Sequence, residues 1–474
     1  MTDFAALLTA DTGQPALTIV PVTAEGFAAW RAAAGVRALA AADAAGFAGK
    51  AGEVLIVPGD AAGAWSVAVG VESGSLGPWA LAAAAEKLPA GTYRLAGDAS
   101  EEGSALAGSA DPSAALSGWL LAQHRFDRYR APPAGAAGPR VLVSDAAAIP
   151  PAIALAEATA LVRDLVDTPA GDLDPAALAD AIRAEGERFG AEVRVIDGEA
   201  LERGFPAVAA VGRAAACPPR LIDLAWGDPA HPKVTLVGKG VTFDSGGLDI
   251  KPASAMRLMK KDMGGAAVAL GVARLVMGAR LPVRLRLIVP AVENAIAGNA
   301  FRPGDVLRTR AGITVEIGNT DAEGRLILAD ALTYAQEEDA PDLLLDFATL
   351  TGAARVALGP DLPALYSHDD ALAADLLAAG TAAGDPLWRM PLWRPYAEML
   401  KSTVADIDNS GEGGFAGSIT AALFLDRFVR AEHAWAHLDL YAWNPTARPG
   451  RPKGGAATGL AAAWGLLRHR YGGG

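Results

Sequence analysis

Apolar runs that recur at regular intervals in the second half of the chain constrain its fold more than any other feature. The run at 342–348 reads DLLLDFA, and similar runs predict strands at 192–196, 221–226, 233–238, 283–289, 313–317 and 434–440. Helical spacing of apolar residues between them predicts helices at 175–189, 262–277, 326–337, 417–430 and 459–468. Strands that are apolar throughout are buried on both faces, so we predict an α/β/α domain with a mixed central sheet.

The first part of the chain has a different character. Short β-type runs at 17–22, 53–57, 66–71 and 140–143 alternate with alanine-rich segments of helical character, which predicts a small α/β domain for scaffolding or assembly. At 474 residues the chain is too long for one ordinary core. We therefore expect an N-terminal domain at 1–145, a linker helix within 146–172 and a larger domain at 173–474. The stretches 98–112 and 131–139 are rich in loop-forming residues.

Charge and cysteine content exclude several classes of protein. The net charge of -13 and the sequence pI near 5.0 argue against a general affinity for nucleic acid or an anionic membrane, both of which need a basic face. Cys217 is the only cysteine, which excludes intrachain disulfides and favours a cytoplasmic protein. We expect neither a signal peptide nor a membrane span, because charges such as Glu157, Arg163 and Asp164 interrupt the apolar stretches.

Two clusters of charged residues follow predicted strands. Lys239 comes directly after the strand at 233–238, so the glycine-rich loop 240–251 should lie at the carboxyl edge of the sheet, where ligands bind. Asp244 and Lys251 belong to this loop, and Asp262 follows it. The second cluster, NTDAEGRL at 319–326, carries Asp321 and Glu323 two residues apart, a spacing that points both carboxylates the same way in an extended segment.

Four carboxylates gathered in one place need compensating positive charge, because like charges raise one another's pKa. One or two divalent cations would supply it. Oxygen ligands suit Mg²⁺, Mn²⁺ or Ca²⁺, and Lys239 is a candidate nitrogen ligand if its amine is neutral. With an amine ligand, Zn²⁺ and Co²⁺ are also compatible.

A serine hydrolase is an alternative. The FDSGG run at 243–247 is superficially similar to the segment around the nucleophile of trypsin-like serine proteases, with Ser245 as the nucleophile. Those proteases are all-β and have a histidine upstream, whereas this serine lies in an α/β pattern. The six histidines form no HExxH motif, so the acids must hold any metal.

Taken together, the two clusters resemble the leucyl aminopeptidase family of cytosolic metallopeptidases. The family signature Asn-Thr-Asp-Ala-Glu-Gly-Arg-Leu matches 319–326 without a change, and the resemblance extends through VGKGVTFDSGG at 237–247, DMGG at 262–265 and ATLTGA at 348–353. It implies a catalytic domain of the zinc-exopeptidase type. It also implies an enzyme that hydrolyses N-terminal, preferably leucine-like residues from peptides, using a water activated by two divalent ions.

Site residues follow from the same resemblance, position by position. It implies metal ligands at Lys239, Asp244, Asp262, Asp321 and Glu323. Asp244 and Glu323 would bridge the two ions, Lys239 and Asp262 would complete one, and Asp321 the other. The catalytic pair would be Lys251, which stabilises the oxyanion, and Arg325, which holds a bicarbonate that serves as the base.

The resemblance also implies a pocket for the first side chain and an assembly. The pocket maps in part onto Met259, Thr349 and Gly352, which suit leucine-like side chains. The chain departs from the family after Asp439, where Leu440-Tyr441-Ala442-Trp443 replaces the usual Ala-Gly pattern and changes the expected pocket width. A homohexamer with active sites facing an inner cavity is implied as well.

Because some bacterial relatives bind DNA, a non-enzymatic DNA-binding role is a second alternative. The acidic net charge of the chain argues against it.

Overall fold

The protein consists of two compact units. The computed structural model describes residues 2–59, 61, 63–72, 76–96, 112–130, 138–337, 339–411 and 413–472. One unit comprises Met1–Ala160 with Thr446–Lys453, and the other comprises Leu161–Pro445 with Gly454–Gly474. Both are α/β, and the second is the larger, which confirms the expected fold class. The exact boundaries at 145 and 172 stay a prediction, and most of 98–112 and 131–139 lies outside the described residues.

The first unit is built on one six-stranded sheet. Its strand order is β1-β6-β5-β2-β4-β3, in which only the β3/β4 pair is antiparallel. The strands are β1 (Leu8–Ala10), β2 (Leu17–Thr23), β3 (Val54–Pro58), β4 (Trp65–Val71), β5 (Gly91–Leu95) and β6 (Pro139–Val143). The helices are η1 (Phe4–Leu7), α1 (Phe27–Ala33), α2 (Val36–Ala45), α3 (Ala82–Lys87), α4 (Pro112–Leu121) and η2 (Ala146–Ala148). Trp119 and Tyr93 are fully buried at the centre of its core.

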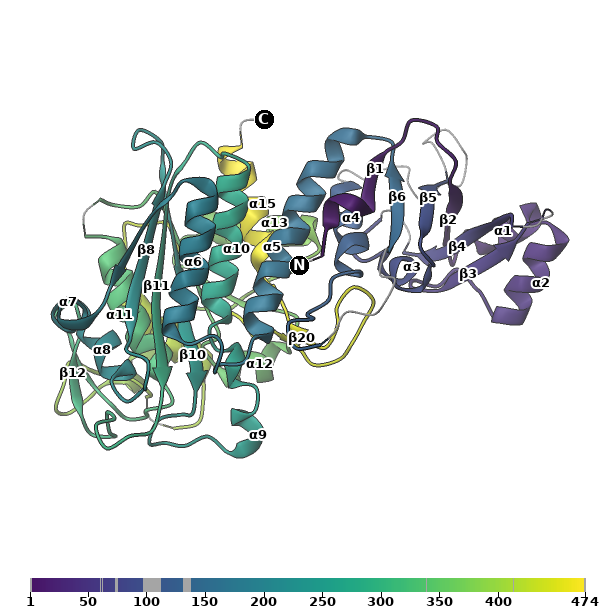
Figure 1. The fold of residues 1–474 in the computed structure, drawn as a ribbon. Helices are drawn as coiled ribbons and strands as arrows, with labels where there is room; N and C mark the ends of the chain where they lie inside the picture. Colours follow the sequence, from purple (N-terminus) through teal and green to yellow (C-terminus); the bar gives the residue numbers. More distant parts are fainter. Residues whose placement is uncertain are drawn as a thin grey trace. The chain divides into compact units, whose positions relative to one another are not determined.

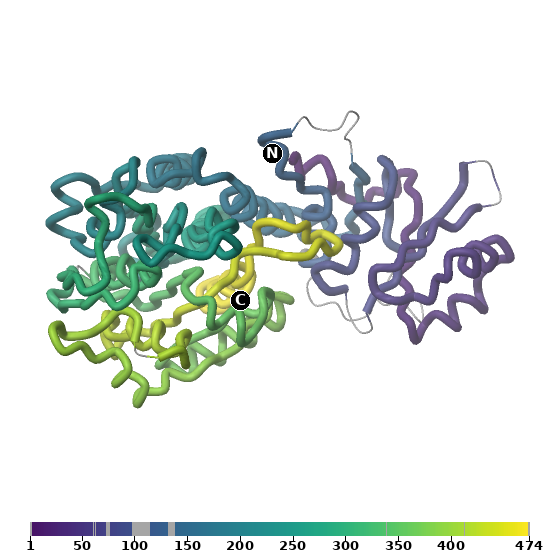
Figure 2. The backbone as a smooth tube through the Cα atoms, turned by 90° about the horizontal axis from the view of Figure 1, so that it is seen from below, coloured from purple at the N-terminus to yellow at the C-terminus, as the bar shows by residue number. Residues whose placement is uncertain are grey.

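A late segment of the chain completes this unit. Residues 446–453, within the yellow part of the tube in Figure 2, group with the first unit rather than with the sequence around them. The amide of Gly450 donates to Oε1 of Glu86 at 2.7 Å, and the guanidinium of Arg451 lies 4.9 Å from the centre of the Trp79 ring. The first unit therefore depends on two separate parts of the sequence.

Helix α5 (Ile149–Asp167) is long and apolar. With the turn before it, over Ala146–Asp167, it is the one helix among the described residues that could cross a membrane by length and composition. However, Ala148, Ala152, Ala156 and Ala160 recur at a spacing of four and pack into the core of the first unit. This packing is that of a core helix in a globular protein.

The second unit contains a nine-stranded mixed sheet. Its order is β16-β15-β18-β14-β9-β11-β8-β7, and β10 also pairs with β11. The strands are β7 (Glu192–Ile196), β8 (Arg220–Trp226), β9 (Lys233–Gly238), β10 (Gly240–Asp244), β11 (Arg284–Asn294), β14 (Leu343–Ala348), β15 (Ala364–Tyr366), β16 (Trp388–Arg389) and β18 (Trp435–Asp439). Every residue of β9 and β14 is buried, as their apolar runs predict.

Helices cover both faces of this sheet. Figure 1 shows α6 (Pro175–Phe189), α10 (Gly264–Gly278) and α15 (Leu460–Tyr471) on one side, and α8 (Pro206–Gly212) and α11 (Glu323–Ala335) on the other. The remaining helices are α7 (Gly198–Gly204), α9 (Ala253–Met256), η3 (Met259–Lys261), α12 (Gly352–Leu358), α13 (Asp370–Ala383), η4 (Arg394–Leu400) and α14 (Gly417–Asp426). There are also two small sheets. One consists of β12 (Val306–Arg308), β13 (Thr314–Glu316) and β17 (Ile407–Asp408), and the other of β19 (Trp443–Asn444) and β20 (Gly454–Gly455).

The centre of the sheet positions the candidate site. Strands β18, β14, β9, β11 and β10 are mutually parallel, so their carboxyl ends lie at one edge. The prediction of a loop over 240–251 was wrong in its first part, because Gly240–Asp244 forms β10 beside the end of β11. A Cβ at Gly240 would lie 2.6 Å from the carbonyl oxygen of Pro290, so glycine permits this close pairing. Asp244 is consequently the last residue of a strand and is fixed by the sheet.

Candidate active site

A cavity of about 320 Å³ at the carboxyl edge of the sheet gathers most of the predicted site residues. Its lining includes two lysines and two acids of the first cluster together with Asp321 and the three expected pocket residues: Lys239, Asp244, Lys251, Asp262, Asp321, Met259, Thr349 and Gly352. Glu323 and Arg325 lie on α11 beside it. The structure therefore brings residues from 239 to 352 into one place.

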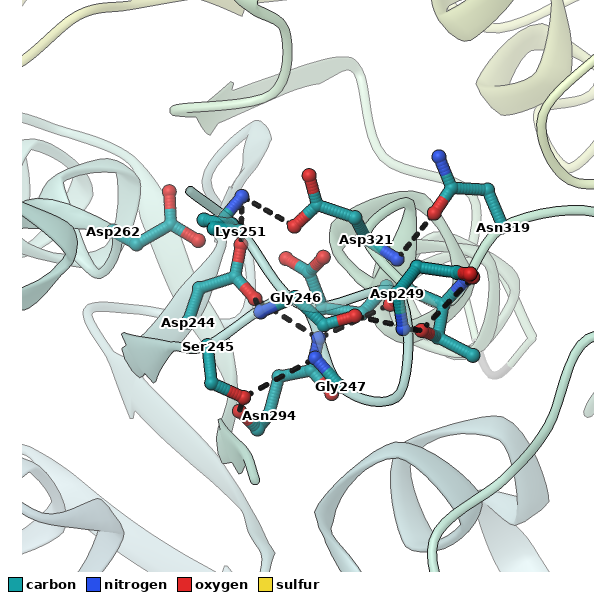
Figure 3. Close-up of polar contacts among 12 residues, drawn as sticks. Asp244, Ser245, Gly246, Gly247, Asp249, Lys251, Asp262, Asn294, Asn319 and Asp321 are labelled. Atoms are coloured by element: carbon teal, nitrogen blue, oxygen red, sulfur yellow. Dashed lines mark hydrogen bonds and ion pairs between the residues drawn. The ribbon is translucent and has the colours of Figure 1, made fainter. Parts of the chain in front are cut away.

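A glycine turn folds Lys251 back over Asp244. Gly246 and Gly247 have φ angles of +89° and +66°, which side chains other than glycine rarely adopt. The amide of Gly246 donates to Oδ1 of Asp244 at 2.9 Å, and the amide of Lys251 donates to the carbonyl oxygen of Ser245 at 3.0 Å. As Figure 3 shows, the Lys251 ammonium then lies between two carboxylates, 2.8 Å from Oδ2 of Asp244 and in contact with Asp321.

Lys239 lies on the other side of the acidic cluster. Its Nζ is 2.7 Å from Oδ2 of Asp262 and 3.0 Å from Oε1 of Glu323, and it donates to the carbonyl oxygen of Thr349 at 3.0 Å. The Thr349 hydroxyl lies 2.8 Å from both the carbonyl oxygen and Oδ1 of Asp262. Lys239 thus pairs with Asp262 and Glu323, and Lys251 pairs with Asp244 and Asp321.

The second cluster is not extended as predicted. Asp321 lies in a turn, and Glu323 is the first residue of α11. The cause is Asn319, whose Oδ1 accepts the amide of Asp321 at 2.7 Å and bends the chain. The two carboxylates consequently have different neighbours. Glu323 joins Asp244 and Asp262 in a group whose oxygens lie within 4.8 Å of one another, whereas Asp321 contacts Lys251.

The crowding of acids changes their ionisation. Burial, together with the charge of Asp244, raises the pKa of Glu323 to about 8 and that of Asp321 to about 6. Burial alone would lower the pKa of Lys239, but the carboxylates of Asp262, Glu323 and Asp244 outweigh it and raise this pKa. These side chains by themselves hold Lys239 protonated. The neutral amine expected from the sequence therefore requires further positive charge among the acids.

The donor set fits divalent cations. Oδ2 of Asp262 and Oε1 of Glu323 are buried and lie at ion-pair distance from Lys239, yet neither has a hydrogen-bond partner among the described residues. The single charge of Lys239 does not balance the three carboxylates that lie within reach of one another, so further positive charge beside these oxygens would be favourable. Three carboxylates in mutual reach, with one amine beside them, are suitable ligands for such cations.

Arg325 is buried on the first turn of α11. It donates to the carbonyl oxygen of Asn409 at 2.5 Å, and its Nε has no hydrogen-bond partner among the described residues. Burial lowers its pKa to about 10, so the guanidinium remains charged at neutral pH. Arg325 forms no ion pair with Glu323 in the described part of the chain, which leaves its free N–H group available for a small anion.

Sequence reasoning did not identify two asparagines that hold the site. Asn294, fully buried at the end of β11, donates to Oδ1 of Asp244 at 2.9 Å and to the carbonyl oxygen of Thr320 at 3.1 Å. Asn409 accepts the amides of Gly318 and Asn319 and donates back to the carbonyl oxygens of Asn319 and Ala322. Neither residue belongs to a motif, so only the tertiary structure reveals them.

Among the described residues, the hydroxyl of Ser245 has no hydrogen bond to a side chain that could act as a general base. Its hydroxyl donates to the carbonyl oxygen of Asn294 at 2.7 Å and accepts the amide of Gly247 at 3.2 Å. Both partners are backbone groups, so the hydroxyl supports the glycine turn. A nucleophilic serine would need a side chain that takes up its proton.

Comparisons with known proteins agree with this geometry. Residues 160–463 match the model of the cytosol aminopeptidase family, catalytic domain, and residues 17–137 match that of the M17 aminopeptidase N-terminal domain. A probable cytosol aminopeptidase of Chlorobaculum parvum is 47% identical over 308 residues, which are 64% of this chain and 60% of that protein. The chain thus spans about three fifths of the length of that relative.

Solved structures are similar along nearly the whole chain. The cytosol aminopeptidase of Coxiella burnetii superposes with a TM-score of 0.90 at 44% identity, over 98% of this chain and 99% of that one. The bottromycin maturation enzyme BotP, solved in complex with Mn, superposes with a TM-score of 0.85 at 37% identity, over 96% and 99% of the two chains.

Proposed function

The chain belongs to the cytosol aminopeptidase family, and we propose that it is a metal-dependent aminopeptidase that removes residues from the N-termini of peptides. The observation that carries this proposal is the cavity in which acids, three lysines and the expected pocket residues meet. Its volume of about 320 Å³ suits the end of a peptide rather than a folded protein.

Five residues would hold two divalent ions: Lys239, Asp244, Asp262, Asp321 and Glu323. Asp244 and Glu323 would be shared by both ions, Lys239 and Asp262 would bind one, and Asp321 the other. When bound, such ions lower the pKa of a water and polarise the scissile carbonyl. Zn²⁺ or Mn²⁺ is our first choice, with Mg²⁺ and Co²⁺ also compatible. Support comes from the buried oxygens of Asp262 and Glu323, and from the Mn bound to BotP.

Lys251 would stabilise the oxyanion that forms when the peptide carbonyl is attacked. Its ammonium faces the cavity between Asp244 and Asp321, and these acids raise its pKa although burial opposes them. It therefore stays charged throughout the reaction. A fixed positive charge at the position where negative charge develops lowers the barrier without reorganisation.

Arg325 would hold the proton acceptor rather than act as one, because its guanidinium is protonated at neutral pH. Its planar fork suits a bidentate oxyanion such as bicarbonate. The N–H group without a partner on Arg325 supports this assignment, since the anion would satisfy it. The carbonyl oxygen of Asn409, which accepts a hydrogen bond from another nitrogen of Arg325, helps to orient the guanidinium.

Met259, Thr349 and Gly352 would border the first side chain of the peptide, for which we expected leucine-like residues. All three line the cavity.

We further propose a homohexamer that acts in the cytoplasm on small peptides, on the basis of the family. Sedimentation at a mass six times that of one chain would support this assembly, and a stable monomer that remains fully active would contradict it.

Hydrolysis of a leucine chromogenic amide tests the proposed activity. The wild type should be active with added Mn²⁺ or Zn²⁺ and inactive after prolonged chelation. Asp244→Ala should be inactive, because it removes a carboxylate shared by both ions. Ser245→Ala should keep activity, since its hydroxyl only bonds to backbone groups. Activity that survives chelation and disappears in Ser245→Ala would instead support a serine hydrolase.

A further inference from the structure

Lys261 is a buried cation on the wall of the cavity. It ends the short helix η3, its side chain lines the cavity, and the residue is only 4% exposed. Among the described residues its ammonium has no carboxylate at ion-pair distance and no hydrogen-bond acceptor. The ammonium lies over the face of the Tyr441 ring, whose centre is 4.7 Å from Nζ.

A second cation contacts the same ring. Arg355, on α12, also lines the cavity, and its Cζ lies 5.3 Å from the centre of the Tyr441 ring. It forms no ion pair within the described part of the chain, and its residue is exposed. Tyr441 thus holds two cations at one wall, which we call the cationic wall (Lys261, Arg355 and Tyr441).

The acids of the cavity are already paired with other lysines. Asp262 contacts Lys239, while Asp244 and Asp321 contact Lys251. The nearby carboxylates of Asp262 and Asp439 favour the charge on Lys261, but among the described residues no carboxylate lies at ion-pair distance from either cation of the cationic wall. Burying an ammonium without a counter-charge is unfavourable, and a ligand that supplies a carboxylate would remove this cost.

The cationic wall adjoins the groups expected to react. Lys261 is the chain neighbour of Asp262, and Thr349, which contacts Asp262, lines the same cavity. A substrate group that reaches the wall must be attached close to the bond being cleaved. The side chain of the first residue meets this condition, and in a dipeptide the C-terminal carboxylate is the other source of the same chemistry.

On the basis of the proposed aminopeptidase function, we propose that the cationic wall binds the side-chain carboxylate of the first residue, so that peptides beginning with Glu or Asp are preferred substrates. This differs from the leucine-like preference expected from Met259, Thr349 and Gly352. Lys261 supplies the buried contact, and Arg355 supplies charge at the exposed part of the wall. Tyr441 positions both cations.

The test compares glutamyl and glutaminyl chromogenic amides, which have the same shape but differ in charge. For the wild type loaded with Mn²⁺, kcat/KM should be higher for the glutamyl amide by about tenfold or more, the effect of one charge-assisted hydrogen bond. In Lys261→Met this ratio should fall to about one, and Lys261→Arg should restore part of it. Equal rates for both amides in the wild type would overturn the proposal without any variant.

Lys260→Met is the matched control. It makes the same change one residue away, but the ammonium of Lys260 contacts the carbonyl oxygen of Asp167 and the Trp443 ring and does not line the cavity. In Lys260→Met the ratio of kcat/KM for the glutamyl amide to that for the glutaminyl amide should equal the wild-type ratio. If this ratio falls equally in Lys260→Met and Lys261→Met, the effect comes from net charge or local unfolding, and the assignment to Lys261 is wrong. Thermal unfolding of each variant checks that the fold is intact.

Two further comparisons separate the remaining outcomes. Cleavage of Leu-Gly in preference to Leu-Gly amide, lost in Lys261→Met, would assign the wall to the C-terminal carboxylate of a dipeptide and overturn the side-chain proposal. Failure to hydrolyse leucyl, glutamyl and glutaminyl amides alike would mean that the proposed activity itself is wrong. Hydrolysis of the leucyl amide with no preference for Glu over Gln would overturn only the present inference.

Discussion

Gly324 lies against the side chain of Lys239, so close that a Cβ at position 324 would be 2.6 Å from Cε and 2.8 Å from Nζ of the lysine. Only glycine at this position lets the ammonium reach Asp262 and Glu323. The second residue of α11 therefore controls the proposed nitrogen ligand.

Gly324→Ala should reduce activity at least about tenfold while leaving the fold intact. Alanine favours a helix by about 1 kcal/mol over glycine, and the clash falls on a flexible side chain. The lysine is displaced rather than the backbone. Kinetics and thermal unfolding would measure the two effects, with Gly298→Ala as the control because a Cβ there meets nothing within 4 Å. Wild-type activity in Gly324→Ala would contradict the role of Lys239.

Lys251→Met should lower kcat about a hundredfold with little change in KM, because the lost contact forms only as the oxyanion develops. Metal content should not fall, since removing this ammonium frees Asp244 and Asp321 from a competing cation. Loss of metal in parallel with activity would show that Lys251 acts on the metal site instead. Lys401→Met, at an exposed position, controls for net charge.

Asp330→Ala should destabilise the second unit by about 3 kcal/mol or more, because three backbone amides lose their acceptor in a buried place. Oδ2 of Asp330 accepts the amides of Ala207 and Val208 at the start of α8, and Oδ1 accepts that of Arg310. Denaturant unfolding would measure the loss. The exposed Asp180→Ala should change stability by only about 0.5 kcal/mol. If the two substitutions change the free energy of unfolding equally, the hydrogen bonds of Asp330 between α8 and α11 do not stabilise the unit as proposed.

Asp11 and Arg94 make the stability of the first unit depend on pH. Hydrogen bonds from Arg94 to Asp11, at 2.5 and 2.9 Å, lower the pKa of Asp11 from 3.8 to about 2. Because the folded-state pKa is the lower one, the pair stabilises the fold above about pH 4, and this contribution is lost as the pH falls toward 2. Asp11→Asn should thus lower the unfolding temperature more at about pH 6 than at about pH 3. An equal shift at both pH values would contradict the pairing.

The extent to which the sequence predicts the fold depends on local signals. The helix at 175–189 was predicted to the residue, because Asp174 caps its start and Gly190, in a left-handed conformation, ends it. Buried strands such as β9 were predicted from their apolar runs. Strand β10 was missed, because its glycine and charged residues resemble a loop and only pairing with β11 makes it a strand.

The candidate site was predictable where residues belong to motifs. The acids and lysines of the two clusters lie together, as we expected because both clusters follow predicted strands of one sheet. The start of α11 at Glu323 was not predicted, because the turn at Asn319 determines it. The cationic wall was not predicted either, since Lys261 and Tyr441 are 180 positions apart in sequence and meet only in the fold.

We propose that the described acids and Lys239 hold two ions and that both ions are needed for activity. Titration of metal-depleted protein with Mn²⁺, in which bound metal and hydrolysis of the leucyl amide are followed together, tests this requirement. We predict that activity appears as the second equivalent binds, and that Lys239→Ala binds only one equivalent tightly and stays inactive. Full activity without metal or with a single equivalent, or two tightly bound equivalents in Lys239→Ala, would contradict a two-ion site with Lys239 as a ligand.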